Sequence, residues 1–118
     1  MARKRKGDPV HGWLVIDKPL NMSSAKAVYY AKNYLNAAKV GHGGTLDPMA
    51  SGVLPLAFGE ATKTLSYAVN KTKKYKFTIR WGEARDTDDL EGNIIGTSDV
   101  KPGVSAIQNI LKRFIGEV

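Results

Sequence analysis

The run from Gly41 to Pro48 constrains this chain most, because it holds three glycines and ends in a proline between two apolar segments. Glycine permits turns closed to other residues and lets the backbone approach a ligand closely, while Pro48 fixes its own φ and biases Asp47 toward an extended conformation. The run therefore predicts a loop that presents the carboxylate of Asp47. Aspartate before proline is also common in ordinary turns and helix caps, so the run alone leaves a purely structural role open.

Apolar periodicity predicts both helices and strands along the chain, which places it in the α+β class with a largely antiparallel sheet. The clearest pattern is Tyr75 to Trp81, where apolar and polar residues alternate for seven positions as in a half-buried strand. Pro55 interrupts another strand candidate, and because proline donates no ladder hydrogen bond we expect it at an edge or a bulge. The expected strands span residues 12–17, 53–58, 75–81 and 94–98, the helices 24–36, 60–69 and 104–115, and a polar loop 82–93.

The composition is basic: 18 Lys and Arg face 11 Asp and Glu, and the net charge is +7 with a pI near 9.7. Such a balance attracts polyphosphates such as RNA through counterion release. Four of the positive charges lie together at Arg3 to Lys6, so residues 1–11 are predicted to form a basic, flexible N-terminal arm. An arm that contacts RNA and a plain solvated tail both remain open for it.

Several classes of protein are excluded or disfavoured. The chain has no cysteine, which excludes disulfides and cysteine-ligated zinc, and its two histidines do not suggest a histidine-rich metal site. No segment approaches the ~18 apolar residues of a membrane span, and no signal peptide is visible, so we expect a cytoplasmic protein. Thr62 stands where a phosphate-binding loop needs glycine before its lysine, and the acidic stretch from Asp86 to Gly92 lacks the ligand spacing of a calcium loop.

Two further blocks carry a family resemblance: Asp17 to Ser24 before the glycine-rich run, and Met49 to Lys63 after it. Together with Gly41 to Pro48 they resemble the TruB family of tRNA pseudouridine synthases, and the resemblance extends from about Gly12 to Val118. It implies isomerisation of a uridine in the T arm of tRNA to pseudouridine, without metal or organic cofactor. It also implies the pseudouridine-synthase catalytic fold, a mixed, largely antiparallel sheet flanked by helices.

Members of that family are substantially longer than this chain. Residues 12–118 are therefore predicted to be the N-terminal part of the catalytic domain, with the fold present only in part. The family's catalytic-site arginine and C-terminal RNA-binding module would lie outside it, so we expect the fragment to be inactive alone. An open sheet edge and uncovered apolar surface would also favour self-association.

The resemblance assigns the chemistry to Asp47, as nucleophile, base or both, after the target uridine has been flipped out of the stacked RNA. It assigns substrate contacts to His42, whose ring can stack on a base, and to Tyr75, which matches the tyrosine that stacks on the target uracil. Without the resemblance, His42 would be an ordinary loop histidine and Tyr75 one member of an apolar strand face.

Three more residues complete the predicted substrate-binding set. Lys18 and Lys63 match family lysines, with phosphate contact, support of the Asp47 loop, or plain surface charge as the open roles. Asp89 would orient the missing arginine, or would belong to a solvated acidic loop. A non-catalytic RNA-binding module, and a metal-assisted hydrolase using Asp86, Asp88 and Asp89, stay open as alternative functions.

Overall fold

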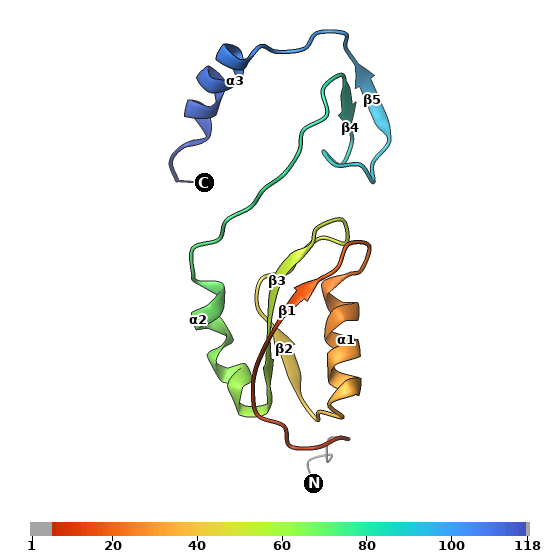
Figure 1. The fold of residues 1–118 in the computed structure, drawn as a ribbon, viewed down its shortest axis with the longest axis vertical. Helices are drawn as coiled ribbons and strands as arrows, with labels where there is room; N and C mark the ends of the chain where they lie inside the picture. The colour runs from red at the N-terminus through yellow and green to blue at the C-terminus, as the bar shows by residue number, and fades with distance from the viewer. Residues whose placement is uncertain (1–5, 118) are drawn as a thin grey trace. The chain divides into compact units, whose positions relative to one another are not determined.

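The computed structural model describes residues 6–117, and the chain forms two compact units, Met1–Lys73 and Lys74–Val118 (Figure 1). Helices and antiparallel strand pairs occur together, which confirms the predicted α+β class. None of the helices within residues 6–117 has the length and hydropathy that a membrane-spanning helix requires.

The first unit is built on a three-stranded sheet. Its strands are β1 (Gly12–Lys18), β2 (Val40–His42) and β3 (Gly52–Phe58), in the order β1-β3-β2, and both pairings are antiparallel. A single parallel bridge outside these strands joins Asp8 to Ala37. The strands predicted at residues 12–17 and 53–58 are confirmed, whereas β2 takes in Gly41 and His42, for which the sequence predicts a loop.

Helix α1 (Ser24–Tyr34) covers one face of this sheet. Its N-cap is Ser23, whose side chain accepts the N–H of Lys26, so the predicted helix start is confirmed. Leu54, Leu56 and Phe58 alternate along β3 and are buried in one cluster with Ala27 of the helix, as the two-residue period of a strand allows. Ala57, which lies between them in the strand, is also buried. The core consists of Ala27, Ala37, Leu54, Leu56 and Phe58, with Val28 and Ala31 of the helix packed against it.

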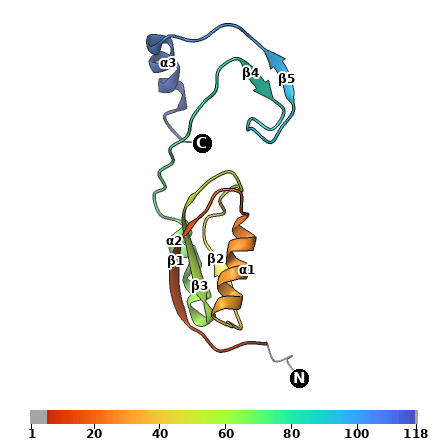
Figure 2. The ribbon, with the colours of Figure 1, turned by 45° about the vertical axis from the view of Figure 1, so that its right-hand side comes forward.

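The opposite face of the sheet meets a 3₁₀ turn, η1 (Gly59–Thr64), and a short helix, α2 (Leu65–Val69). Figure 1 and Figure 2 show α1 and α2 on opposite sides of the sheet. An ideal Cβ on Gly41 would lie only 2.8 Å from Cδ1 of Leu65, so the glycine of β2 allows α2 to approach. The helix predicted at residues 60–69 therefore exists, but its first half is 3₁₀.

Pro55 does not lie in an edge strand, because β3 is the central strand. Its carbonyl accepts the N–H of Gly43 at 3.1 Å, immediately beyond the last residue of β2. The N–H and C=O of one residue in an extended strand point to the same side, so the missing donor faces the stretch where β2 has ended. The predicted edge position is wrong. Pro55 is nevertheless tolerated, because no residue of β2 needs a hydrogen-bond donor at this position.

The N-terminal segment is anchored from Asp8 onward. The N–H of Asp8 donates to the Asn36 carbonyl, its carbonyl accepts the N–H of Ala38, and His11 Nδ1 accepts the N–H of Glu60. Residues 8–11, expected to belong to the arm, therefore lie against the body of the first unit. Of the basic cluster, Lys6 is described and exposed, while Arg3, Lys4 and Arg5 lie outside the described residues.

The second unit contains a hairpin of β4 (Glu83–Arg85) and β5 (Ile94–Thr97), then α3 (Val104–Leu111) and a 3₁₀ turn, η2 (Lys112–Phe114). The return strand and the final helix are confirmed. The predicted loop at residues 82–93 contains β4, which is the partner of β5. None of this unit's described residues is buried.

The strand predicted from Tyr75 to Trp81 is wrong for this structure. The segment forms no strand, and its apolar side chains are exposed, with 66% of Tyr75 and 77% of Phe77 accessible. Alternation reports that a segment fits a half-buried sheet, but a strand exists only when a neighbour accepts and donates its hydrogen bonds. Within residues 74–117, the only ladder is that of β4 with β5.

Candidate active site

Asp47 lies in the connection between β2 and β3 and is exposed. Its carbonyl accepts the N–H of Ala50 at 2.9 Å, which closes a turn behind it. In the described part of the chain, no hydrogen bond or ion pair uses its carboxylate. The loop therefore presents an unpartnered carboxylate to the outside, as the glycine-rich run predicts.

The backbone on both sides of Asp47 is held by residues at or just before the start of α1. Ser24, which is 2% exposed, donates its hydroxyl to the Leu46 carbonyl and accepts the N–H of Leu46, both at 2.9 Å. The N–H of Asn21 donates to the Pro48 carbonyl at 2.7 Å. The two anchors hold the positions before and after Asp47, so Asn21 and Ser24 constrain the backbone of the loop.

Ser24 and Asn21 are functional candidates that the sequence does not predict. The local pattern marks Ser24 only as a possible helix cap, and Asn21 only as part of a turn. One signal is present: two consecutive serines stand at a helix start where a single N-cap is needed. The second serine is therefore free for another contact.

Lys18 lies at the end of β1 and is fully buried. Its ammonium donates to the carbonyls of Pro19 at 2.8 Å and Met22 at 2.6 Å, which binds it to the turn that carries Asn21. Asn21 itself adopts a φ of 60°, a conformation that asparagine tolerates better than most residues. This geometry favours support of the Asp47 loop over phosphate contact, because a side chain without exposed surface cannot reach a phosphate.

His42 is the last residue of β2, opposite Leu56, and is half-buried. Its Nδ1 is buried without a hydrogen-bond partner, and it is the one such side-chain atom among the described residues. Because His42 ends the strand, its imidazole lies where the loop that carries Asp47 begins. The substrate contact assigned to His42 stays a prediction, because the unsatisfied nitrogen is itself buried.

Lys63 lies in η1, where it pairs with Glu60 and where both side chains are mostly exposed. The hydrogen bond and the charge of Lys63 lower the pKa of the Glu60 carboxyl. Within residues 6–117, Lys63 makes no hydrogen bond or ion pair with the Asp47 loop. The loop-support role is not realised for this residue, and its phosphate contact stays a prediction.

A lysine that the sequence pattern does not single out lies at the loop instead. An ideal Cβ on Gly44 would be 3.8 Å from both Cε and Nζ of Lys73, so this ammonium lies beside the glycine three positions before Asp47. Gly44 has a φ of 71°, which favours glycine and leaves its open side to the lysine. No acidic partner of Lys73 occurs in the described part of the chain, so its charge is available to an anion.

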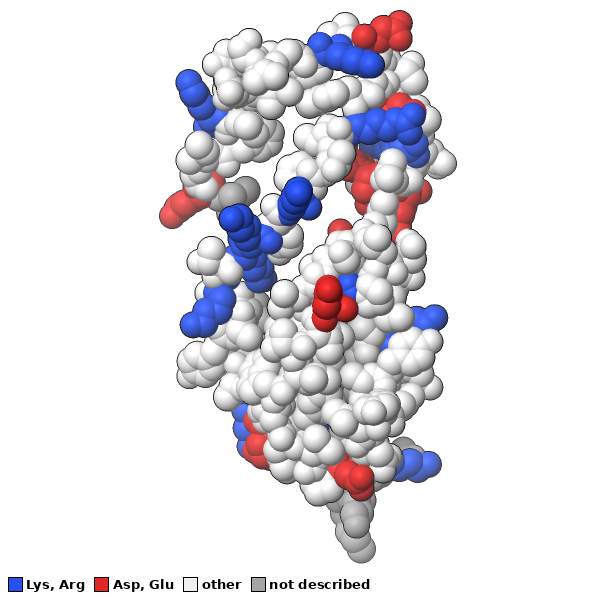
Figure 3. Space-filling model, in the orientation of Figure 1, with Lys and Arg blue, Asp and Glu red and all other residues white. Residues whose placement is uncertain are grey.

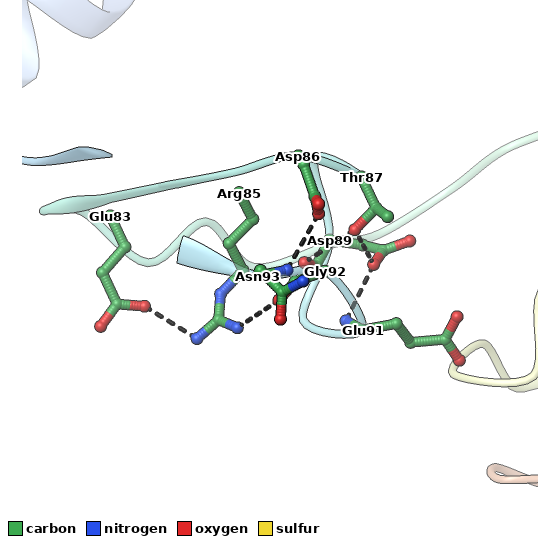
Figure 4. A network of polar contacts seen from close by, with 8 residues as sticks. All are labelled: Glu83, Arg85, Asp86, Thr87, Asp89, Glu91, Gly92 and Asn93. Atoms are coloured by element: carbon green, nitrogen blue, oxygen red, sulfur yellow. Dashed lines mark hydrogen bonds and ion pairs between the residues drawn. The ribbon is translucent and has the colours of Figure 1, made fainter. Parts of the chain in front are cut away.

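Tyr75 and Asp89 belong to the second unit. Tyr75 is exposed in an extended segment, so the structural alternative of packing in a strand face is not realised. Asp89 Oδ1 accepts the hydroxyl of Thr87 at 2.7 Å and the N–H of Glu91 at 2.9 Å (Figure 4). The Thr87 hydroxyl, followed by the Glu91 N–H, holds the pKa of Asp89 below its usual value.

The polar groups of the acidic turn between β4 and β5 form hydrogen bonds within the hairpin. Asp86 accepts the N–H of Asn93 at 2.9 Å, and Arg85 donates to the Gly92 carbonyl at 2.8 Å and to Glu83 at 3.0 Å (Figure 4). Across residues 6–117, no three His, Cys, Asp or Glu side chains come together as metal ligands do. This turn therefore gives the metal-assisted hydrolase no support.

Comparison with known proteins gives a consistent result. Residues 32–118 match the family described as TruB family pseudouridylate synthase (N terminal domain). The chain is 58% identical over 118 residues to tRNA pseudouridine synthase B of Rhodospirillum rubrum, covering 100% of this chain and 38% of that protein. It is 54% identical over 116 residues to the tRNA pseudouridine synthase B of Gluconacetobacter diazotrophicus, covering 98% of this chain and 38% of that one.

Among solved structures, a Cbf5-Nop10-Gar1 complex aligns with a TM-score of 0.46 and 46% identity, covering 48% of this chain and 17% of that chain. An H/ACA RNP bound to a substrate RNA containing 2'-deoxyuridine aligns with a TM-score of 0.47 and 36% identity, covering 57% and 24%. The chain thus spans about 38% of the length of the two bacterial relatives that it matches almost end to end.

Proposed function

This chain belongs to the TruB family of pseudouridylate synthases, and we propose that it supplies the N-terminal catalytic part of an enzyme that converts a uridine of tRNA to pseudouridine. The proposed target is a uridine in the T arm, and the proposed location is the cytoplasm. Asp47 carries the chemistry, and His42 and Tyr75 arrange the substrate.

The observation that carries this proposal is the presentation of Asp47. Asp47 is exposed and its carboxylate has no hydrogen-bond or ion-pair partner among residues 6–117, while hydrogen bonds hold the backbone at Leu46 and Pro48. The carboxylate of a structural aspartate in a turn or cap would instead accept hydrogen bonds from nearby N–H groups, as that of Asp89 does. A carboxylate that has no hydrogen-bond partner among the described residues and stands on a fixed backbone can act as a nucleophile or a base.

The reaction defines the demands on that carboxylate. The bond between ribose C1′ and uracil N1 breaks, the uracil rotates, a new bond joins C1′ to C5, and the proton of C5 leaves while N1 gains one. Asp47 can attack as a nucleophile, accept a proton, or do both in turn. No redox change or co-reactant is needed, so a single carboxylate with a binding site for the flipped uracil accounts for the chemistry.

The charge of the chain supports RNA as the partner. Lys and Arg side chains gather along the extended segment that follows α2, where the sequence has Lys71, Lys73, Lys74 and Lys76 (Figure 3). All four residues are exposed. Polyphosphate binding through such lysines is independent of sequence and positions the RNA, whereas the site around Asp47 selects the base.

Release of tritium from C5-labelled uridine in an unmodified tRNA transcript tests the proposal. Because the chain spans about 38% of its relatives, the assay uses a chimera in which residues 1–118 replace the matched segment of the Rhodospirillum rubrum protein. We expect release by the chimera, none by Asp47→Asn, and retention of the transcript without release by the 118-residue chain alone. Retention with no release by the unsubstituted chimera would favour a non-catalytic RNA-binding module.

A further inference from the structure

The two serines at the start of α1 make different contacts. Ser23 is exposed, and its Oγ accepts the N–H of Lys26 at 3.1 Å, which caps the helix. Ser24 is buried, and within the described part of the chain the hydrogen bonds of its hydroxyl all go to the backbone of Leu46, 22 positions further along. Because Ser23 already provides the N-cap, the helix does not require the hydroxyl of Ser24.

The contact of Ser24 resembles one rung of a sheet. Its hydroxyl accepts the N–H and donates to the C=O of the same residue, so it satisfies both polar groups of Leu46, which is itself half-buried. The Leu46 side chain packs against the core at the same time. Residue 46 is therefore held at its side chain and at both backbone groups, immediately before Asp47.

We propose that Ser24 is a positioning residue for Asp47: its hydroxyl fixes the backbone at Leu46 and so sets the direction from which the carboxylate meets the target uridine. This inference rests on the proposed function. The Asp47 carboxylate has no partner of its own in the described residues, so its placement depends on the backbone. A displacement of about 1 Å at a reacting group can cost about 100-fold in rate.

Four variants, made in the chimera described above, separate positioning from general stability. Ser24→Ala removes the hydroxyl, while Ser24→Thr and Ser24→Val have similar volume and differ in whether a hydroxyl is present. Ser23→Ala is the matched control, because it removes a hydrogen bond at the same helix terminus without touching Leu46. We expect kcat to fall about 10- to 100-fold in Ser24→Ala and Ser24→Val, with KM nearly unchanged. The kcat of Ser24→Thr should be higher than that of Ser24→Val, and the kcat of Ser23→Ala should stay within about two-fold of the unsubstituted chimera.

Amide hydrogen exchange in the 118-residue chain tests the contact itself, independently of activity. The Leu46 amide is expected to be protected in the unsubstituted chain and in Ser23→Ala, and to lose protection in Ser24→Ala. An unprotected Leu46 amide in the unsubstituted chain, or equal kcat values for the Thr and Val variants, would overturn the positioning role.

The two proposals fail in different ways. If Asp47→Asn retains activity, the proposed function is wrong whatever the Ser24 variants do. If Asp47→Asn is inactive while Ser24→Val and Ser24→Ala turn over at the rate of Ser23→Ala, the proposed function stands and Ser24 is only structural.

Discussion

Leu65 occupies the space in which residue 41 would carry its side chain: an ideal Cβ on Gly41 lies 2.8 Å from Cδ1 of Leu65. The glycine belongs to β2, and the leucine is the first residue of α2. Their proximity joins an edge strand of the sheet to the short helix that follows η1. It also shows that Gly41 serves packing, although it stands in a run that looks like a flexible loop.

Substitution of Gly41 by alanine should destabilise the first unit by about 1 kcal/mol, the low end of the cost of overpacking, because the atom in the way is the far end of the Leu65 side chain, which can shift. Gly43→Ala is the graded comparison, because its Cβ would meet Val69 Cγ2 at 3.2 Å, a contact that a small shift relieves. Chemical denaturation followed by circular dichroism measures both. A loss in Gly41→Ala no larger than in Gly43→Ala would contradict the packing explanation.

Lys18→Met should destabilise the first unit by about 1–3 kcal/mol, because the carbonyls of Pro19 and Met22 lose their donor. Lys63→Met is the control: its pair with Glu60 is exposed, and exposed ion pairs contribute little to stability. The free energy of unfolding of the two variants decides between a supporting lysine and a surface charge at position 18. Equal values would exclude the support role.

Lys73→Gln should weaken binding of a tRNA transcript and make the salt dependence of log K shallower by about 0.7–0.9, the loss of one phosphate contact. The reason is that the Lys73 ammonium lies beside Gly44 and has no acidic partner among the described residues. Lys26→Gln, on the exposed surface of α1, should leave the slope unchanged. Filter binding at several salt concentrations measures the slopes, and identical slopes for both variants would refute the contact.

Thr87→Val should raise the pKa of Asp89 toward its ordinary value of 3.8, because the Thr87 hydroxyl is the first cause of its lowering. A carboxyl whose folded pKa is depressed contributes stability that is present above its unfolded pKa and lost as the pH falls through the folded pKa. The acidic turn should therefore loosen only below about pH 4. A carboxyl-detected NMR titration follows Asp89, and an unchanged pKa in Thr87→Val would contradict the assignment.

The 118-residue chain should self-associate through the exposed apolar side chains of the second unit. Tyr75, Phe77 and Ile79 are 66%, 77% and 55% exposed, and such surface is rarely left uncovered in a soluble monomer. Sedimentation at rising concentration should show association, reduced by Phe77→Lys. A monodisperse monomer over the whole range would argue against this.

Local elements that need only their own residues can be predicted from the sequence. The start of α1 follows from the capping chemistry of Ser23, the strand from Gly12 follows from an apolar run, and the exposed carboxylate of Asp47 follows from a glycine-rich run ending in proline. The family can also be recognised from the sequence, because the residues from 17 to 24 and from 41 to 63 follow the family pattern over too many positions to match by chance.

Which distant groups meet depends on the folded chain. The pairing of Ser24 with Leu46, the burial of Lys18 in the turn it supports, and the approach of Leu65 to Gly41 depend on how the chain returns on itself, which local propensity does not encode. The failure at Tyr75 to Trp81 has the same cause. A period of two describes one face of a strand, whereas the strand itself depends on hydrogen bonds supplied by another part of the structure.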